Sequence, residues 1–467
     1  MIDLNKISRI YIVGVGGIGT SAVARFFLKL GKVVSGSDRI VSSNTQDLEK
    51  FGIKVNIGHS ENYVDNSIDL VIYTEDITSD SQGYIEIEKA EKLQIPILSY
   101  AQALGMLMDG YYGIGVTGTN GKSTTAAILG LILDHAGLDP SVIIGSKLSE
   151  INETENFHAN ARFGLGKYFV CEADEYHRHM MEGKPQMIIL TNVAEDHLDY
   201  YKDLTDIEKA FSDYIATLPN DGVVIYNADD HNAVEVARNA HCHKLTFGIH
   251  HYGDVQALNL EIKDQKQHFD VHFKDEFLFR CAVSIPGKYN ISNILGAVAA
   301  AIKLGVDAEI IKQTIQEFSG IWRRFEKVGE INGKIIYSDY GHHPAAITGV
   351  LEAIKDFYAG KKVLLVFQPH HHNRTKKLFG EFAESLISSQ YTIIPEIFDV
   401  SGREKTVDQD ISSQDLINEV KKLGGAAEYA KDLQATKVRV LEIIKDFDAV
   451  IFMGAGDIDN LAREIVK

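Results

Sequence analysis

The sequence predicts an α/β protein built from three successive domains. The chain has 467 residues, and at about 150 residues per domain this length corresponds to roughly three domains. Short apolar runs of strand length alternate along the chain with segments whose apolar residues recur at helical spacing. Hydrophobic residues make up 45% of the chain and charged residues 24%, so each domain can bury a core of its own. A disordered or fibrous chain is therefore excluded.

The first predicted domain covers residues 1–110 and opens as a strand, a glycine turn and a helix. The apolar run Arg9–Val13 predicts the strand, and apolar residues at helical spacing continue to Leu30, where Gly31 ends the helix. This pattern is half of a nucleotide-binding α/β unit. Further strands of this domain are expected over 32–36, 70–74 and 95–99.

The second and third predicted domains, 111–323 and 324–467, repeat the alternation of strands and helices. The second begins with a strand over 113–117, a glycine loop and a helix over 122–135. Its remaining elements are strands over 168–171 and 187–191, a β-rich stretch over 242–285 and a helix over 290–304. Those of the third are strands over 334–338, 362–368, 391–398 and 449–453 and a helix over 345–357.

Charge and cysteine content limit the partners of the protein. The 47 Lys and Arg residues against 65 Asp and Glu residues leave a net charge of −18, which opposes nonspecific attraction to nucleic acid or anionic lipid. Cys171, Cys242 and Cys281 are too far apart for a disulfide framework or a CxxC metal site, and they suit a reducing compartment. No run approaches the roughly 18 apolar residues of a membrane span. We expect a cytoplasmic protein with no nucleic-acid or membrane partner.

A glycine turn follows the first predicted strand. Gly14, Gly16 and Gly19 fit the GxGxxG pattern, and Asp38 lies nineteen positions beyond Gly19. Positions without side chains let a diphosphate approach the backbone N–H groups at a helix N-terminus. The turn therefore predicts a dinucleotide such as NAD or a nucleotide sugar, with a tight turn that binds nothing as the alternative.

A second glycine loop has the sequence GTNGKSTT and predicts ATP binding. Its backbone N–H groups would wrap phosphate oxygens, Lys122 would place a charge at the terminal phosphates, and the Ser123 hydroxyl would reach Mg²⁺. The strict GxxxxGK[ST] spacing fails because Val116 stands where its first glycine belongs. The nucleotide-binding residues predicted from this loop are Gly118, Thr119, Asn120, Gly121, Lys122, Ser123 and Thr124.

Acidic residues and a histidine follow the next two strands. Because the carboxyl ends of parallel strands line one crevice, Glu172 and His197 are candidates for binding Mg²⁺ or a substrate beside the loop. Such residues are also common in solvated loops. His177 and His179 are expected at alternate positions of an extended segment that faces solvent.

Polar clusters surround the first strands of the third domain. Their arginines can grip phosphoryl or carboxylate groups through paired hydrogen bonds. Consecutive imidazoles on a loop diverge, so substrate contact or solvation is expected for the histidines rather than zinc binding. The clusters are WRRFE at 322–326, SDYGHHP at 338–344 and FQPHHHNR at 367–374, with histidines at 342, 343, 370, 371 and 372.

The motifs and their order resemble the Mur ligase family over essentially the whole chain. The matching segments are VGVGGIGTSAVA, SGSD, GTNGKSTT, EADE, TNVAEDHLD, PGKYNISNILGAVAAA, GIWRRFE, SDYGHHP, VFQPHHHNRT and FMGAGDI. The resemblance implies a Rossmann-like N-terminal domain for the UDP-sugar, a central P-loop ATPase-type domain and a Rossmann-like C-terminal domain that admits the amino acid. It implies ATP-dependent amide formation with Mg²⁺ in peptidoglycan precursor synthesis, through an acyl phosphate that yields ADP and phosphate. The motifs are most similar to the branch that joins L-alanine to the lactyl carboxylate of UDP-N-acetylmuramate.

The resemblance also implies roles for individual residues. Lys122, His197, Arg324 and His342 correspond to catalytic positions, and Ser123, Glu172 and His197 to magnesium ligands. The ATP contacts are Asn290 and Asn293 on the adenine side with Arg324 and Asp339 from the edge of the third domain. The substrate contacts are Gly14, Gly16, Gly17, Gly19 and Asp38 for the sugar nucleotide, with His342, His371 and Arg374 near the acceptor carboxylate and the amino acid.

Several positions depart from the L-alanine-adding branch. Asn120, Ser123, Ser338 and His371 stand where that branch commonly has His, Thr, Asp and Arg, and EADEYHRH replaces EADESDAS. The loss of a forked cation at His371 leaves open a ligase that adds a peptide or another amino acid. Folylpolyglutamate synthase shares the GTNGKS type of loop, but the N-terminal domain with its GxGGxG turn argues against this alternative. An NAD-dependent oxidoreductase would leave Lys122 without a role, and a P-loop switch would not need the first domain. Both a monomer and a homodimer remain open.

Overall fold

The computed structural model describes residues 2–148, 157–198, 200–399 and 411–467. These residues form two compact units. The first unit consists of Met1–Leu258, Asp270–Cys281 and Ile291–Glu317, and the second of Asn259–Phe269, Ala282–Asn290 and Phe318–Lys467. Across the described ranges, no helix is long and apolar enough to cross a membrane. The three cysteines are unpaired and buried.

The N-terminal part of the first unit contains a five-stranded parallel sheet with the order β3-β2-β1-β4-β5. Its strands are β1 (Arg9–Val13), β2 (Val33–Asp38), β3 (Lys54–Ile57), β4 (Leu70–Tyr73) and β5 (Ile97–Ser99). The order reverses at β1, so the carboxyl end of β1 is the switch point at which such sheets bind ligands. The predicted Rossmann-like N-terminal fold is confirmed.

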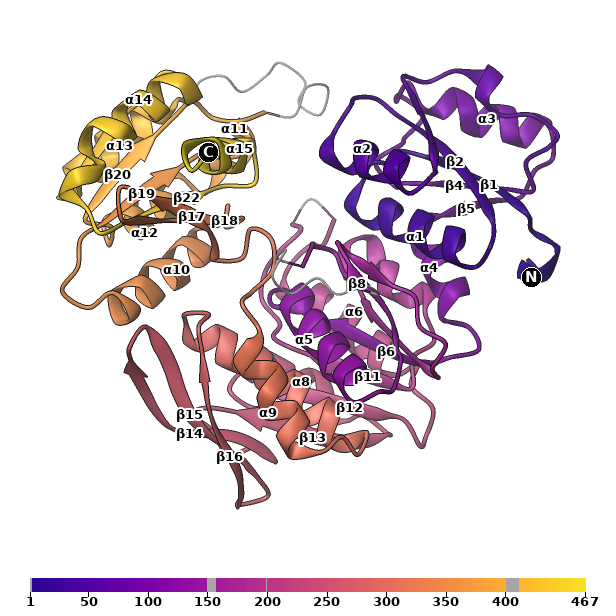
Figure 1. Ribbon diagram of the computed structural model, residues 1–467, viewed down its shortest axis with the longest axis horizontal. Helices are drawn as coiled ribbons and strands as arrows, with labels where there is room; N and C mark the ends of the chain where they lie inside the picture. The colour runs from indigo at the N-terminus through magenta and orange to yellow at the C-terminus, as the bar shows by residue number, and fades with distance from the viewer. Residues whose placement is uncertain (1, 149–156, 199, 400–410) are drawn as a thin grey trace. The chain divides into compact units, whose positions relative to one another are not determined.

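Helices cover both faces of this sheet because alternate residues of β1 point in opposite directions. Ile10 and Ile12 belong to a core with α1 (Ile18–Lys29), α2 (Ser43–Lys50) and α4 (Tyr100–Met108). Tyr11 and Val13 belong to the core on the side of α3 (Tyr84–Lys92). Figure 1 shows these helices around the strands. The burial of both faces explains why the strands read as continuous apolar runs.

The central part contains an eleven-stranded sheet with the order β16-β15-β14-β13-β12-β11-β6-β10-β7-β9-β8. Its strands are β6 (Tyr112–Thr117), β7 (Ser141–Ile143), β8 (Phe157–His158), β9 (Ala161–Arg162), β10 (Tyr168–Glu172), β11 (Met187–Leu190), β12 (Val223–Asn227), β13 (His243–Gly248), β14 (Val255–Lys263), β15 (Lys266–Phe273) and β16 (Glu276–Val283). Its helices are α5 (Lys122–His135), α6 (Leu204–Ile215), α7 (His231–Arg238), α8 (Lys288–Lys303) and α9 (Ala308–Glu317), with the 3₁₀ segment η4 (Tyr176–Glu182). Strand β6 lies between β10 and β11 and is parallel to both, so the loops after these three strands share one edge.

The C-terminal part contains a six-stranded sheet with the order β17-β18-β22-β19-β20-β21, in which only the β17–β18 pair is antiparallel. Its strands are β17 (Glu326–Ile331), β18 (Lys334–Asp339), β19 (Val363–Phe367), β20 (Tyr391–Ile394), β21 (Ala427–Tyr429) and β22 (Ala449–Met453). Leu365 and Ile451 pack in the core of α10 (Pro344–Phe357), α12 (Phe379–Leu386) and α13 (Ser413–Lys422), whereas Leu364 and Val450 pack with α14 (Leu433–Ile443) and α15 (Ile458–Ile465). The short helix α11 (His372–Lys377) follows β19.

Several predicted strands extend a residue or two beyond the observed ones, and one extends further. The sequence predicts a strand over 391–398, but β20 ends at Ile394. Pro395 follows directly, and a proline has no N–H with which to continue the ladder. The β-rich stretch predicted over 242–285 is confirmed by β13 to β16.

Candidate active site

The first glycine turn connects β1 to α1. Gly14 has a φ of +77°, and its N–H and that of Val15 both donate to the Ser37 carbonyl oxygen at 2.9 Å. The Gly16 N–H donates to Asp38 Oδ2 at 2.9 Å, and a Cβ on Gly16 would lie 2.7 Å from that oxygen. Asp38 thus already closes the turn from within the protein. Its predicted contact with a nucleotide stays a prediction.

Gly17 and Gly19 have close neighbours inside the protein as well. A Cβ on Gly17 would lie 2.8 Å from Thr20 Oγ1, and one on Gly19 would lie 2.5 Å from Tyr100 Cζ. Packing therefore accounts for glycine at both positions, whether or not a diphosphate also approaches them.

The second glycine loop connects β6 to α5, with Gly121 as the N-cap of α5 at a φ of +88°. A Cβ on Gly121 would lie 2.1 Å from Asn293 Oδ1, and one on Gly118 would lie 2.3 Å from Thr191 Oγ1. Asn293, predicted from the motifs, therefore lies against the loop. The Asn120 N–H donates to Asn192 Oδ1 at 3.0 Å, a contact that the sequence did not indicate.

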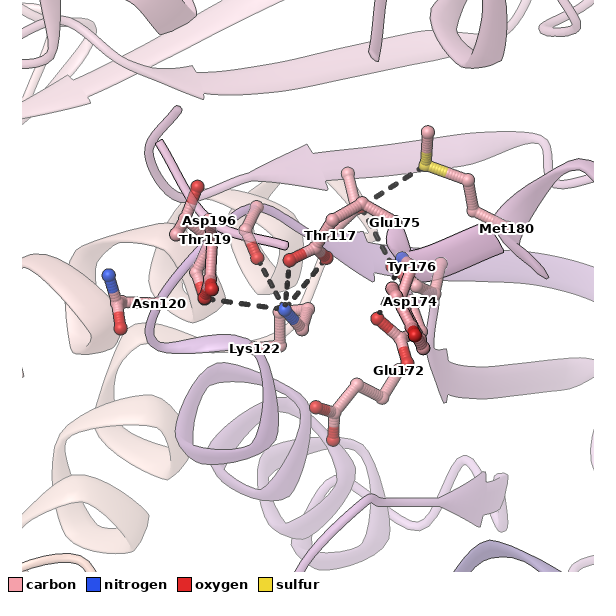
Figure 2. A network of polar contacts seen from close by, with 12 residues as sticks. Thr117, Thr119, Asn120, Lys122, Glu172, Asp174, Glu175, Tyr176, Met180 and Asp196 are labelled. Carbon is pink, nitrogen blue, oxygen red and sulfur yellow. Dashed lines mark hydrogen bonds and ion pairs between the residues drawn. The ribbon is translucent and has the colours of Figure 1, made fainter. Parts of the chain in front are cut away.

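Lys122 is held by the loop itself and by an acid from the end of β10 (Figure 2). Its Nζ donates to the Gly118 carbonyl oxygen at 2.7 Å and to Glu175 Oε2 at 2.8 Å. Burial by itself lowers the pKa of Lys122, but the carboxylates of Glu175, Asp174 and Glu172 outweigh burial, and the pKa is raised. Burial raises the pKa of Glu175 to about 7, against the opposing effect of Lys122. The site thus holds one permanent cation among several carboxylates.

The predicted magnesium ligands divide between two neighbouring groups. Glu172 Oε2 accepts hydrogen bonds from Ser123 Oγ at 2.8 Å and from the Gly145 N–H at 2.6 Å. His197 Nε2 instead lies 3.9 Å from Glu175 Oε1.

Asp174, Glu175 and His197 each offer one ligand atom, and these atoms lie within 4.8 Å of one another. Two of the three donors are carboxylate oxygens, which Mg²⁺ prefers, and the third is an imidazole nitrogen, so the carboxylates are the part of the set that fits this ion. Asp174 and Glu175 were not among the predicted ligands. The signal available in the sequence was their position in EADE, directly after the strand.

The second unit gathers another part of the predicted site at the end of β18. Asp339 accepts hydrogen bonds from the N–H groups of Phe325 at 2.8 Å and Gly341 at 2.7 Å. Burial raises the pKa of Asp339, against the opposing charge of Arg324. The Arg324 guanidinium lies 5.2 Å from the centroid of the Tyr340 ring. Arg324 and Asp339 therefore lie in one group, and their contact with ATP, which the resemblance implies, stays a prediction.

Histidines follow β18 and β19 in the same unit. His342 Nδ1 lies 3.1 Å from the Tyr340 carbonyl oxygen, and the rings of His342 and His370 are 6.0 Å apart. His371 is the N-cap of α11 with a φ of +69°, and its Nδ1 lies 3.8 Å from Asp399 Oδ1. His342, which follows β18, thus lies beside the histidines that follow β19.

Two further predicted residues lie elsewhere in the second unit. Arg374 lies within α11, and the Asn290 side chain donates to the Pro286 carbonyl oxygen at 2.7 Å.

The extended segment predicted for His177 and His179 is wrong, whereas the expected exposure to solvent holds for His177. Both lie in η4 rather than in an extended segment, because His177 and Arg178 have left-handed φ values of +49° and +61° that turn the chain. The two imidazoles consequently lie on one side, 5.9 Å apart and 18° from parallel.

A parallel sheet with a phosphate-binding loop, a partly buried lysine and an acidic cluster at one edge is typical of an enzyme that uses a nucleoside triphosphate. The family model described as "Mur ligase family, catalytic domain" matches residues 9–112, "Mur ligase middle domain" matches 116–301, and "Mur ligase, glutamate ligase domain" matches 323–456. The chain belongs to the Mur ligase family, and the predicted resemblance is confirmed.

The similar proteins align over the whole chain. The UDP-N-acetylmuramate–L-alanine ligase of Caldanaerobacter subterraneus subsp. tengcongensis is 37% identical, with 100% of this chain and 99% of that protein covered. The ligase of the same name from Aquifex aeolicus is 35% identical, with 99% and 98% covered. The crystal structure of UDP-N-acetylmuramate-alanine ligase from Thermotoga maritima matches with a TM-score of 0.82 at 27% identity, with 98% of each chain covered. A murein peptide ligase from Psychrobacter arcticus shares the fold, with a TM-score of 0.71 at 23% identity and 98% of each chain covered.

Proposed function

We propose that this chain is an ATP-dependent ligase that joins L-alanine to the lactyl carboxylate of UDP-N-acetylmuramate in peptidoglycan precursor synthesis. The observation that carries the proposal is the end-to-end similarity, at 37% identity, to a protein named for that reaction. The phosphate-binding loop around Lys122 supports the use of ATP, because its lysine lies partly buried at the edge where three parallel strands end.

The chemistry explains why ATP is required. A carboxylate and an amine do not condense in water, so the carboxylate oxygen first attacks the γ-phosphorus of ATP. The bond between the β-phosphate oxygen and the γ-phosphorus breaks, and ADP leaves with its electron pair. The L-alanine nitrogen then attacks the carbonyl carbon of the acyl phosphate, a proton leaves the nitrogen, and inorganic phosphate departs as the amide forms.

The residues of the first unit would neutralise the charge of the transferring group. Lys122 would contact the terminal phosphates, exchanging its ion pair with Glu175 for a phosphate oxygen. Ser123, Glu172 and His197, together with Asp174 and Glu175 beside His197, would hold Mg²⁺, which supplies positive charge at the phosphates when bound. The rest of loop 118–124 and Asn293 would contact the nucleotide.

The remaining predicted residues divide by substrate. Arg324, Asp339 and Asn290 would contact ATP, and His342, His371 and Arg374 the acceptor carboxylate and the amino acid. Gly14, Gly16, Gly17, Gly19 and Asp38 would hold the UDP-sugar. We place the UDP-sugar domain at 1–110, the ATP domain at 111–323 and the amino-acid domain at 324–467, in a cytoplasmic enzyme.

The test is an incubation of the purified chain with ATP, MgCl₂ and UDP-N-acetylmuramate, with L-alanine, glycine, L-serine or an alanine-containing tripeptide added separately. ADP and phosphate release are measured, and the product is weighed by mass spectrometry. A heavier amide conjugate formed best with L-alanine supports the proposal. A conjugate formed only with the tripeptide would point to peptide addition, and nicotinamide reduction without ATP consumption would point to an oxidoreductase.

A further inference from the structure

An aromatic cluster joins the loops that follow β10 and β11. The rings of Tyr176 and His197 stack with centroids 4.5 Å apart and planes 29° from parallel. His177 packs against Tyr176 at 4.3 Å and lies 4.5 Å from Tyr200. We call Tyr176, His177, His197 and Tyr200 the aromatic clamp. Tyr176 and His177 lie within EADEYHRH, where the chain departs from the L-alanine-adding pattern, whereas His197 and Tyr200 lie in the loop after β11, whose TNVAEDHLD segment keeps the family motif.

Contacts with neighbouring residues of the first unit anchor both loops of the clamp, the one after β10 and the one after β11. The hydroxyl of Tyr201, which is buried, donates to the carbonyl oxygen of Glu175, directly before Tyr176. Arg178 forms an ion pair with Asp213 on α6. These contacts hold the turn at η4 in place, so the Tyr176 ring is fixed relative to the end of β10.

His197 needs such a support. Its φ is +53°, a left-handed conformation that a non-glycine residue keeps only when its surroundings hold it there. Its side chain is 33% exposed, so part of the imidazole faces solvent. A histidine that binds a cation must be held so that one ring nitrogen faces the ion. The Tyr176 ring covers one face of the imidazole while Nε2 lies 3.9 Å from Glu175 Oε1.

We propose that Tyr176 is a positioning residue for the cation site. Its ring holds the His197 imidazole facing the carboxylates of Asp174 and Glu175, and this orientation sets the affinity of the group for a divalent cation. The inference rests on the proposed function, in which ATP is used together with such a cation. Aromatic stacking provides the support, so the ring should matter and the hydroxyl should not.

The experiment compares the full chain with Tyr176→Phe, Tyr176→Ala and Tyr176→Leu. Tyr252→Ala is the matched control, because Tyr252 is 66% exposed on a loop outside the clamp. Binding of Mn²⁺ in the presence of a non-hydrolysable ATP analogue is measured by electron paramagnetic resonance. We expect the Ala and Leu variants to bind Mn²⁺ about tenfold more weakly, as for other residues that orient metal ligands, and the Phe and Tyr252 variants to match the wild type.

The kinetics separate positioning from a general loss of structure. The Ala and Leu variants should need about tenfold more Mg²⁺ for half-maximal rate, with an unchanged KM for UDP-N-acetylmuramate and an unchanged circular dichroism spectrum. The inference is overturned if the folded Tyr176→Ala or Tyr176→Leu variant binds Mn²⁺ as tightly as the wild type does. It is also overturned if Tyr176→Phe loses Mn²⁺ affinity, or if the wild type binds no Mn²⁺. A wild type that binds Mn²⁺ and nucleotide but forms no amide would instead contradict the proposed function alone.

Discussion

Replacing Gly121 by alanine tests the phosphate loop at the point where its geometry is tightest. Gly121 has a φ of +88°, and the added Cβ would lie 2.1 Å from Asn293 Oδ1. Real Cβ atoms do not approach an oxygen so closely, so either the loop or Asn293 must move. Gly137, which follows the other end of α5, provides the matched control: its φ is +70°, and a Cβ there meets no atom within 4 Å.

The expected magnitudes follow from these two geometries. A left-handed alanine costs about 1–2 kcal/mol at either position. The clash adds about 1–3 kcal/mol at Gly121 only, so Gly121→Ala should lower the free energy of unfolding by about 2–5 kcal/mol and Gly137→Ala by about 1–2 kcal/mol. At about 2–4 °C per kcal/mol, the extra loss for Gly121→Ala corresponds to a Tm lower by about 2–12 °C.

The assay pairs thermal unfolding with nucleotide binding. Calorimetry with a non-hydrolysable ATP analogue should show that Gly121→Ala binds at least about tenfold more weakly, because the backbone N–H groups of the loop are displaced from the phosphates. Gly137→Ala should bind as the wild type does. Equal Tm values and equal affinities for the two variants would refute the reasoning.

Three further predictions concern single charges and contacts. Lys122→Ala should lower turnover by at least about 10³-fold, because the cation at the transferring phosphate is lost, while calorimetry shows UDP-N-acetylmuramate binding largely intact; equal loss of both would contradict the placement of the two sites. Gly16→Ala, whose Cβ would lie 2.7 Å from Asp38 Oδ2, should raise the KM for UDP-N-acetylmuramate by about tenfold or more with the KM for ATP unchanged. Burial raises the pKa of Glu175 from 4.5 to about 7, so without nucleotide or metal its contribution to stability is greatest below pH 4.5 and is lost as the pH rises through 7. Urea unfolding of Glu175→Gln should lack this decline, and an unchanged pH profile would count against it.

Local patterns were enough to predict the frame of the protein. The run Arg9–Val13 with the glycines after it specified strand, turn and helix, since the side-chain periods of strands and helices are local properties of the chain. Lys122 could likewise be placed at the start of a helix, because the glycine loop before it and the apolar spacing after it are both local. The sequence could also indicate the edge of the sheet at which Glu172 lies, because parallel strands point the same way.

Tertiary structure decided which side chains meet at that edge. Lys122 pairs with Glu175, three residues beyond Glu172, because the turn after β10 brings the later acid to the lysine. The stacking of Tyr176 on His197 depends on left-handed residues in two loops that are far apart in the sequence. Sequence spacing by itself determined where the strands and helices lie and which residues the two glycine loops carry. The partner of each polar side chain was decided only by folding, because it depends on backbone turns and distant contacts that no local period encodes.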